Sequence, residues 1–194
     1  MEGLTEFRLH GRGGQGIVMA AAIFAEAVFN EGLYARAFSL FGAERRGAPV
    51  TAFIRVSEAR LMPRCRVYRP DYVAVLDSSM NSTAVLAGLD QKSRLLINAD
   101  RDEKAARFGE GTANERYPAY LVDATGLAMQ YHLTIGSFPM VNTVMVGALA
   151  RISNLATLES VCAVVEKRIS TRLEDNLKAA AVGFNQVREV IAVA

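Results

Sequence analysis

A short glycine-rich segment contains the residues best suited to bind a ligand. It has the spacing GxGxxG, and its members are Gly11, Arg12, Gly13, Gly14, Gln15 and Gly16. Because glycine lacks a Cβ atom, the backbone here can turn tightly and come close to a ligand, while the amides of a following helix face any anion. The segment predicts a phosphate-binding loop. A strand-to-helix crossover that binds no ligand is the alternative.

A dinucleotide-binding fold needs a further residue after its second strand. An Asp or Glu about 20 residues beyond the loop normally holds the ribose hydroxyls. The corresponding residues 33–40 (LYARAFSL) contain no acid. Arg36 could face a 2′-phosphate, but a single arginine is weak support. A nicotinamide-dependent dehydrogenase is therefore the least favoured function.

The chain offers few residues for catalysis or metal binding. His10 and His132 are its only histidines, and neither has a partner at metal-ligand spacing. Cys65 and Cys162 are far apart and form no CxxC, which excludes an iron–sulfur cluster or a structural zinc built from this chain alone. We expect both cysteines to be partly buried thiols in a reducing cytosol.

The usual motifs of independent enzymes are also missing. The sequence contains no GxSxG, HExxH or GxxxxGK[ST] motif, and no GDG segment typical of a thiamine diphosphate site. The chain thus has a loop whose backbone could bind a ligand, but no evident catalytic acid, base or nucleophile. This combination indicates a supporting subunit that binds no cofactor by itself.

The elements around the glycine loop predict an α/β fold. Apolar and β-branched runs predict strands over residues 5–10, 34–40, 50–56, 72–76, 95–98 and 120–122. Helical spacing predicts helices over residues 17–31, 124–133, 142–151, 158–167 and 173–190, and the charged segment 100–118 is expected to be a surface loop. We predict one domain over residues 1–194. It is a Rossmann-like sandwich with a mainly parallel or mixed sheet and a helical C-terminal region.

Composition and charge exclude several classes of partner. The net charge is only +2, from 22 basic and 20 acidic residues, so nucleic acid is not expected. No signal peptide and no apolar run of membrane-spanning length occurs, which predicts a cytoplasmic protein without a membrane contact. Five arginines gather in one stretch, where we expect a solvated or partner-facing surface, with a phosphorylated ligand as the alternative: Arg55, Arg60, Arg64, Arg66 and Arg69.

Three segments together resemble a known family. They are GRGGQG at 11–16, FGAERRGAPVTAFIRV at 41–56 and PMVNTVMVG at 139–147. In this order they are similar to the γ subunits of pyruvate, ketoisovalerate and related 2-oxoacid:ferredoxin oxidoreductases, and the ERRGAPV portion is the most specific of them. The resemblance covers nearly the whole chain.

The resemblance implies a multi-subunit enzyme. Its reaction converts a 2-oxoacid and coenzyme A into acyl-coenzyme A, carbon dioxide and two electrons. The implied partners are α and β subunits that bind thiamine diphosphate with Mg²⁺, and a ferredoxin-like δ subunit that shares the 4Fe-4S clusters with β. Ferredoxin, or a flavoprotein subunit linked to NAD, would accept the electrons. Which 2-oxoacid is used remains open.

Carried onto this sequence, the resemblance gives candidate ligand residues. The backbone amides of residues 13–16 would meet a phosphate of coenzyme A, and Arg12 would add charge. Arg45 and Arg46 are a second candidate, with a subunit contact or an ion pair to Glu44 as the alternative. We expect Asn142 to cap a helix or meet a partner, and less readily a ligand. The scaffold alternative is a subunit whose loop is a crossover and whose arginines hold its neighbours.

Overall fold

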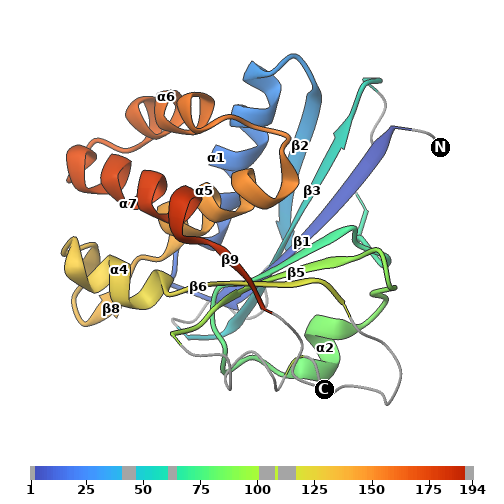
Figure 1. The fold of residues 1–194 in the computed structure, drawn as a ribbon, viewed down its shortest axis with the longest axis horizontal. Coiled ribbons are helices and arrows are strands. Elements are labelled where there is room, and N and C mark those ends of the chain that lie inside the picture. Colours follow the sequence, from blue (N-terminus) through green and yellow to red (C-terminus); the bar gives the residue numbers. More distant parts are fainter. Residues whose placement is uncertain (1–2, 41–46, 61–64, 101–107, 109–116, 191–194) are drawn as a thin grey trace.

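The computed structural model describes residues 3–40, 47–60, 65–100, 108 and 117–190, and a seven-stranded mixed sheet lies at its centre (Figure 1). Strands β1, β4, β5 and β6 are parallel neighbours, whereas β3 and β9 run antiparallel to the strands they join. In spatial order the strands are β2 (Tyr34–Leu40), β3 (Pro49–Ser57), β1 (Leu4–Arg12), β4 (Tyr72–Val75), β5 (Arg94–Asn98), β6 (Ala119–Val122) and β9 (Arg188–Val190).

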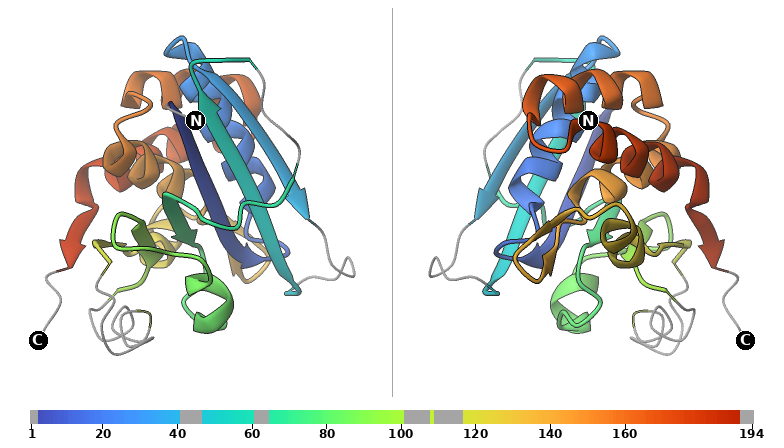
Figure 2. Two further views of the ribbon diagram at one scale, coloured as in Figure 1. Left: turned by 90° about the vertical axis from the view of Figure 1, so that its right-hand side faces the viewer. Right: turned by 90° about the vertical axis from the view of Figure 1, so that its left-hand side faces the viewer.

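Most helices gather on one face of this sheet, as both side views show (Figure 2). They are α1 (Ile17–Asn30), α4 (Ala124–Gln130), α5 (Asn142–Ser153), α6 (Leu158–Arg168) and α7 (Leu173–Gln186). The short helix α2 (Ser82–Leu86) contacts the opposite face through Val85. A two-stranded ribbon of β7 (Thr134–Ile135) and β8 (Phe138–Pro139) precedes α5. This arrangement confirms the predicted α/β fold with a mixed sheet and a helical C-terminal region.

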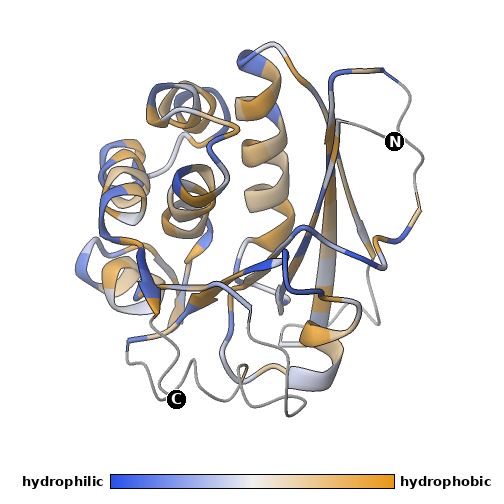
Figure 3. Cartoon of the chain, turned by 45° about the vertical axis from the view of Figure 1, so that its right-hand side comes forward, coloured by the Kyte–Doolittle hydropathy of each residue, from blue (hydrophilic) through white to orange (hydrophobic). Residues whose placement is uncertain are grey.

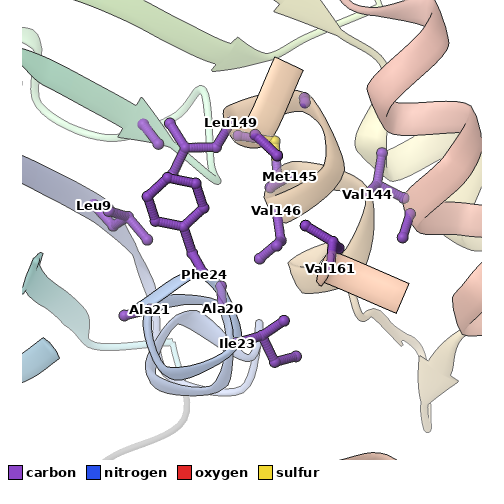
Figure 4. Close-up of a cluster of buried hydrophobic side chains, with 14 of the residues drawn as sticks. Leu9, Ala20, Ala21, Ile23, Phe24, Val144, Met145, Val146, Leu149 and Val161 are labelled. Carbon is purple, nitrogen blue, oxygen red and sulfur yellow. The ribbon is translucent and has the colours of Figure 1, made fainter. Parts of the chain in front are cut away.

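Apolar side chains on both faces of the central strands form the core. Along β4, Tyr72 and Ala74 belong to the cluster under the helices, and Val73 and Val75 belong to the cluster on the other face. Such burial on both faces explains why the strand is apolar throughout. Helix α1 is apolar over most of its length (Figure 3), and Phe24 projects from it into the space between the sheet and α5 (Figure 4).

Helices α5 and α7 cross so closely that their backbones touch. A Cβ atom added to Gly147 of α5 would overlap the carbonyl oxygen of Ala180, and one added to Gly183 of α7 would overlap that of Val144. Both positions therefore require glycine. This close crossing holds α5 in place, so that its first residue, Asn142, lies beside Gly16 of the glycine loop.

The C-terminal helix predicted over residues 173–190 is too long. Helix α7 ends at Gln186, and β9 pairs antiparallel with β6 at the edge of the sheet. Without β9, the edge of β6 would present unpaired backbone N–H and C=O groups. Hydrogen bonding of residues 188–190 to this edge stabilises the fold more than one further turn of α7 would. Of the predicted loop 100–118, most lies outside the described residues, but Phe108 is fully buried in the second cluster.

The face of the sheet away from the main helices contains buried arginine, which corrects the predicted arginine surface. Arg55 is only 3% exposed. It pairs with Glu6 at 2.7 Å and donates to the carbonyl oxygens of Cys65 at 2.6 Å and Arg66 at 3.2 Å. Its role is to hold the segment after β3 against the sheet. Arg60, Arg66 and Arg69 are exposed as expected, whereas Arg64 lies outside the described residues.

Candidate functional site

The glycine loop lies at the switch point of the sheet. Strand β1 leads through α1 to β2 on one side, and β4 leads through α2 to β5 on the other, with the two helices on opposite faces. A crevice at the carboxyl ends of β1 and β4 is where open α/β sheets bind ligands. The predicted strand, glycine turn and helix are confirmed, since α1 begins at Ile17.

Three glycines of the loop meet different requirements. Gly14 and Gly16 have φ of 100° and 79°, which favours glycine at both. Gly14 faces open space, whereas a Cβ atom on Gly16 would lie 2.9 Å from Cγ of Asn142. A Cβ atom on Gly11 would lie 3.2 Å from that of Leu76 at the end of β4. Gly11 and Gly16 therefore serve packing, and Gly14 is the position open to a ligand.

Only part of the loop's backbone is available for an anion. The amide of Gly13 donates to Ala48 at 2.9 Å, and that of Gln15 donates to Arg12 at 3.1 Å. Within the described residues, no hydrogen bond is made by the amides of Gly14 and Gly16, and no side chain caps the start of α1. The predicted phosphate site of residues 13–16 is thus narrowed to two amides and the first turn of α1.

Arg12 is held by the protein itself. Its Nε donates to Asp77 at 3.0 Å, its Nη1 to the carbonyl oxygen of Gly47 at 3.1 Å, and its Nη2 to Ser79 at 3.0 Å. The side chain of Gln15 accepts from the Arg12 amide at 2.8 Å and donates to Asp77 at 3.1 Å. Arg12 and Gln15 therefore fasten the loop to the end of β4.

Asp77 remains ionised in this network. Burial alone would raise its pKa, but hydrogen bonds from Ser79, the charge of Arg12 and a hydrogen bond from Gln15 outweigh that effect and lower the pKa below its ordinary value. The resulting carboxylate neutralises much of the charge that Arg12 was predicted to add.

The strand-end crevice has a volume of about 340 Å³ and an acidic lining. Its charged residues are Asp77, Asp100 and Asp123. Asn98 lies between them and donates to the Leu76 carbonyl oxygen at 2.8 Å, which joins the ends of β5 and β4. Because nearby carboxylates repel a phosphate, this crevice does not suit an anionic group.

Asn142 does not cap α5, contrary to one of its predicted roles. Val141 occupies the N-cap, and Asn142 is the first residue of the helix. The Asn142 side chain lies against Gly16 and lines a second hollow of about 370 Å³ beneath α6 and α7. Arg45 and Arg46, the other predicted pair, lie outside the described residues, as does Glu44.

The β7–β8 ribbon adds an apolar surface that sequence reasoning missed. Ile135 and Phe138 are 53% and 49% exposed and line a small hollow with Gly13 and Gly14. Val18 and Met19, at the start of α1, are exposed as well. The Gly136-Ser137 pair, preceded by the β-branched Thr134 and Ile135 and followed by Phe138, was the available sequence signal for this ribbon.

The histidines and cysteines are not among the described residues that line the hollows around the loop. His10 is buried, and its pKa is lowered to about 4 by burial and by the charge of Arg8, whereas His132 is exposed. Cys162 is half-buried as predicted, but Cys65 is exposed. Among the described residues no cluster of three His, Cys, Asp or Glu side chains could hold a metal, and no helix has the length and apolarity to cross a membrane.

Comparison with known proteins gives similar relatives over nearly the full length. Pyruvate synthase subunit PorC of Methanocaldococcus jannaschii is 40% identical over 95% of this chain and 97% of its own. The pyruvate/ketoisovalerate oxidoreductases common subunit gamma of Thermococcus kodakarensis is 42% identical over 94% of this chain and 97% of its own.

Solved structures show the same fold. Pyruvate oxidoreductase subunit PORC of Thermotoga maritima superimposes with a TM-score of 0.83 at 32% identity, covering 98% of this chain and all of that one. The 2-oxoglutarate:ferredoxin oxidoreductase of Magnetococcus marinus has a TM-score of 0.69 at 18% identity, covering 99% of this chain but 33% of that longer one. The family described as pyruvate ferredoxin/flavodoxin oxidoreductase matches residues 6–186, and this chain belongs to it as a γ-type member.

Proposed function

We propose that this chain, as the γ subunit of a 2-oxoacid oxidoreductase, binds coenzyme A and positions it for chemistry performed by other subunits. The relatives are named for pyruvate or for pyruvate and ketoisovalerate, so pyruvate is the first substrate to test. We expect thiamine diphosphate, Mg²⁺ and the iron–sulfur clusters to belong to the partner subunits.

The observation that carries this proposal is the pair of amides at Gly14 and Gly16, which have no hydrogen-bond partner among the described residues. They lie at the uncapped start of α1, where the helix dipole also favours negative charge. Gly14 has open space in front of it, so a phosphate can approach the backbone. The Magnetococcus marinus enzyme, which contains this fold, has coenzyme A and succinyl-CoA bound in its structure.

Holding coenzyme A beside a reaction centre would accelerate acyl transfer without any acid or base from this chain. Coenzyme A is long, and its thiol must reach an intermediate in a site built by other subunits. A fixed phosphate restricts where the thiol can move, which raises its effective concentration at that site. Arg45 and Arg46 remain candidates for a further phosphate contact.

A scaffold role is the second candidate, and two observations favour it. Arg12 is engaged with Asp77 and Ser79, so it stabilises the loop rather than facing a ligand. Val18, Met19, Ile135 and Phe138 expose apolar surface around the loop, as a subunit contact would require.

Gly14→Asp in the assembled enzyme separates the two functions. Any side chain is strained at this φ of 100°, but aspartate is among the residues that adopt a positive φ most readily, and it has room here and places a carboxylate where the phosphate would bind. We expect the Kd for coenzyme A, measured by calorimetry, to rise about tenfold. Gly32→Asp is the matched control, because Gly32 follows α1 at its other end with φ of 88° and open space.

The scaffold function makes the opposite prediction for the same variants. If Gly14→Asp leaves the coenzyme A Kd unchanged but lowers the recovery of the intact complex in size-exclusion chromatography, the loop serves assembly and the ligand proposal is wrong.

A further inference from the structure

Two hollows of similar volume flank the glycine loop and differ in charge. The strand-end crevice carries three aspartates. The second hollow, which we call the helical hollow, lies between the start of α1, the segment before α5 and the α6–α7 connection. Among the described residues, the charged side chains that line it are Arg168 and Arg172. An anionic ligand that meets the loop is therefore drawn toward the helical hollow.

The arginines of the helical hollow retain donors for such a ligand. Arg168 uses its Nε for Glu26, and Lys167 shares that carboxylate. Arg172 lies 3.8 Å from Asp175, which is too long for a hydrogen bond. Neither acid lines the hollow. Since a guanidinium has five N–H donors, both arginines can still bind a phosphate in the solvent-facing part of the hollow.

Asn142 supplies a second, independent sign of a ligand. The residue is 4% exposed, no hydrogen bond from its side-chain amide is found within the described part of the chain, and its polar atoms, unlike Nε of Arg8 and Nε2 of His10, are not sealed from solvent. The neighbouring Asn176 is satisfied, since it accepts from Thr143 and donates to the carbonyl oxygens of Thr171 and Arg172. The Asn142 amide therefore opens onto the hollow that it lines and has capacity for a polar group that enters there.

The helical hollow also has an apolar wall and a connection to the loop. Met19, Leu133, Met140 and Ile169 line it, which suits a ligand with a heteroaromatic or alkyl portion. Ile135 lines both this hollow and the small hollow that contains Gly13 and Gly14. An extended ligand can therefore reach from the amide of Gly14 to the arginines.

We propose that the helical hollow is a binding subsite for an organic phosphate. Arg168 and Arg172 bind a phosphate group, Asn142 pairs with a polar group of the ligand, and the apolar wall takes its carbon portion. If the ligand is coenzyme A, this inference rests on the proposed function. A free adenine nucleotide has the same chemistry and is the other source to distinguish.

The test measures ligand binding to the assembled enzyme with the double variant Arg168→Gln/Arg172→Gln. Calorimetry with coenzyme A, dephospho-coenzyme A, ADP and pantetheine reports Kd independently of turnover. We expect the double variant to weaken coenzyme A binding about tenfold or more, because two charge-assisted contacts are lost, and to leave pantetheine unaffected. Asn142→Leu should weaken it less. Equal weakening for ADP and coenzyme A identifies the nucleotide portion as the part bound here.

Two matched variants guard against general effects of charge. Lys178→Gln removes one positive charge from α7 outside the hollow and should leave Kd unchanged. Asp100→Asn should strengthen binding only if the phosphate enters the acidic crevice, and that result would overturn the proposal.

The outcomes also separate this proposal from the proposed function. If Gly14→Asp weakens coenzyme A binding and Arg168→Gln/Arg172→Gln does not, the function stands and the subsite is wrong. If neither variant changes Kd, both fail. Weakened binding of ADP with unchanged binding of coenzyme A would make the hollow a site for free nucleotide.

Discussion

The two faces of the sheet are stabilised in different ways. On the face covered by α1 and α4–α7, apolar side chains fill the space and the backbones of α5 and α7 touch at Gly147 and Gly183. On the opposite face of β1 and β3, buried arginines bind carbonyl oxygens: Arg55 holds residues 65–66, and Arg8 donates to Val85 at 2.8 Å and Ala87 at 2.6 Å. Close apolar packing stabilises the first face, whereas hydrogen bonds from arginine stabilise the part of the second face formed by β1 and β3.

The two hollows beside the glycine loop depend on the same two kinds of contact. Helices α1 and α5 meet at Gly16 and Asn142, so the helical hollow depends on tight packing. The strand-end crevice depends on polar contacts instead, through Arg12, Gln15 and Asn98. Variants of the two faces should therefore fail in different ways, and the predictions below run from the largest expected effect to the smallest.

Gly147→Ala should have the largest effect on stability. The added methyl group overlaps the Ala180 carbonyl oxygen, so α5 and α7 must separate. We expect the free energy of unfolding to fall by about 3 kcal/mol or more, as measured by urea denaturation. Gly136→Ala is the comparison, because Gly136, unlike Gly147, has a positive φ and faces open space, so its methyl group meets no neighbour and only the backbone strain of about 1 kcal/mol should be lost. Equal losses would show that the α5–α7 contact is not decisive.

Arg55→Met should destabilise the opposite face by about 2–3 kcal/mol. Methionine fills similar volume, but it leaves the carbonyl oxygens of Cys65 and Arg66 and the carboxylate of Glu6 without their donor. Thermal unfolding measures the loss, and Arg60→Met, at an exposed position nearby, should change little. A neutral Arg55→Met would mean that packing alone holds this face.

His10 should make stability depend on pH in mildly acidic solution. Its pKa falls from 6.5 when unfolded to about 4 when folded, so below pH 6.5 the unfolded chain binds a proton that the folded chain does not. The contribution of His10 to the free energy of unfolding is fully present above about pH 6.5 and is lost as the pH falls toward about 4. We expect a loss of about 2 kcal/mol between about pH 7 and pH 5.

The measurement for His10 is the difference between the unfolding free energies of the wild type and His10→Leu across this range. The variant should show a flatter dependence on pH, whereas His132→Gln, at an exposed position, should follow the wild type. Parallel curves for wild type and His10→Leu would contradict the buried neutral state.

Local pattern was sufficient for the elements that define the loop. Residues 34–40 form β2 over the predicted range, and α1 begins at Ile17 after the glycines. These elements carry their own periodicity, and the glycine spacing marks the turn between them. The ribbon of β7 and β8 and the edge strand β9 were missed, because two or three residues are too few to show a period.

The site was predicted only in part. The GxGxxG segment predicted the turn before α1, which the structure confirms, while its phosphate-binding role stays a prediction. The spacing did not indicate which amides are engaged, such as that of Gly13, which donates to Ala48. Asn142 was predicted to cap α5, and that role is wrong because Val141 occupies the N-cap, whereas its contact with a partner or a ligand stays a prediction. Its burial against Gly16 depends on how α5 crosses α7, which no short pattern contains.

By itself, the sequence determined most of the longer strands and helices, the position of the glycine turn and the γ-type family, because each of these depends on short segments whose residues are close together along the chain. Only the tertiary structure decided that Arg12 is neutralised by Asp77, 65 residues away, and that arginines line one hollow while aspartates line the other. The physical reason is that electrostatic and packing contacts depend on distance in space. The fold sets that distance by joining segments that are remote in sequence.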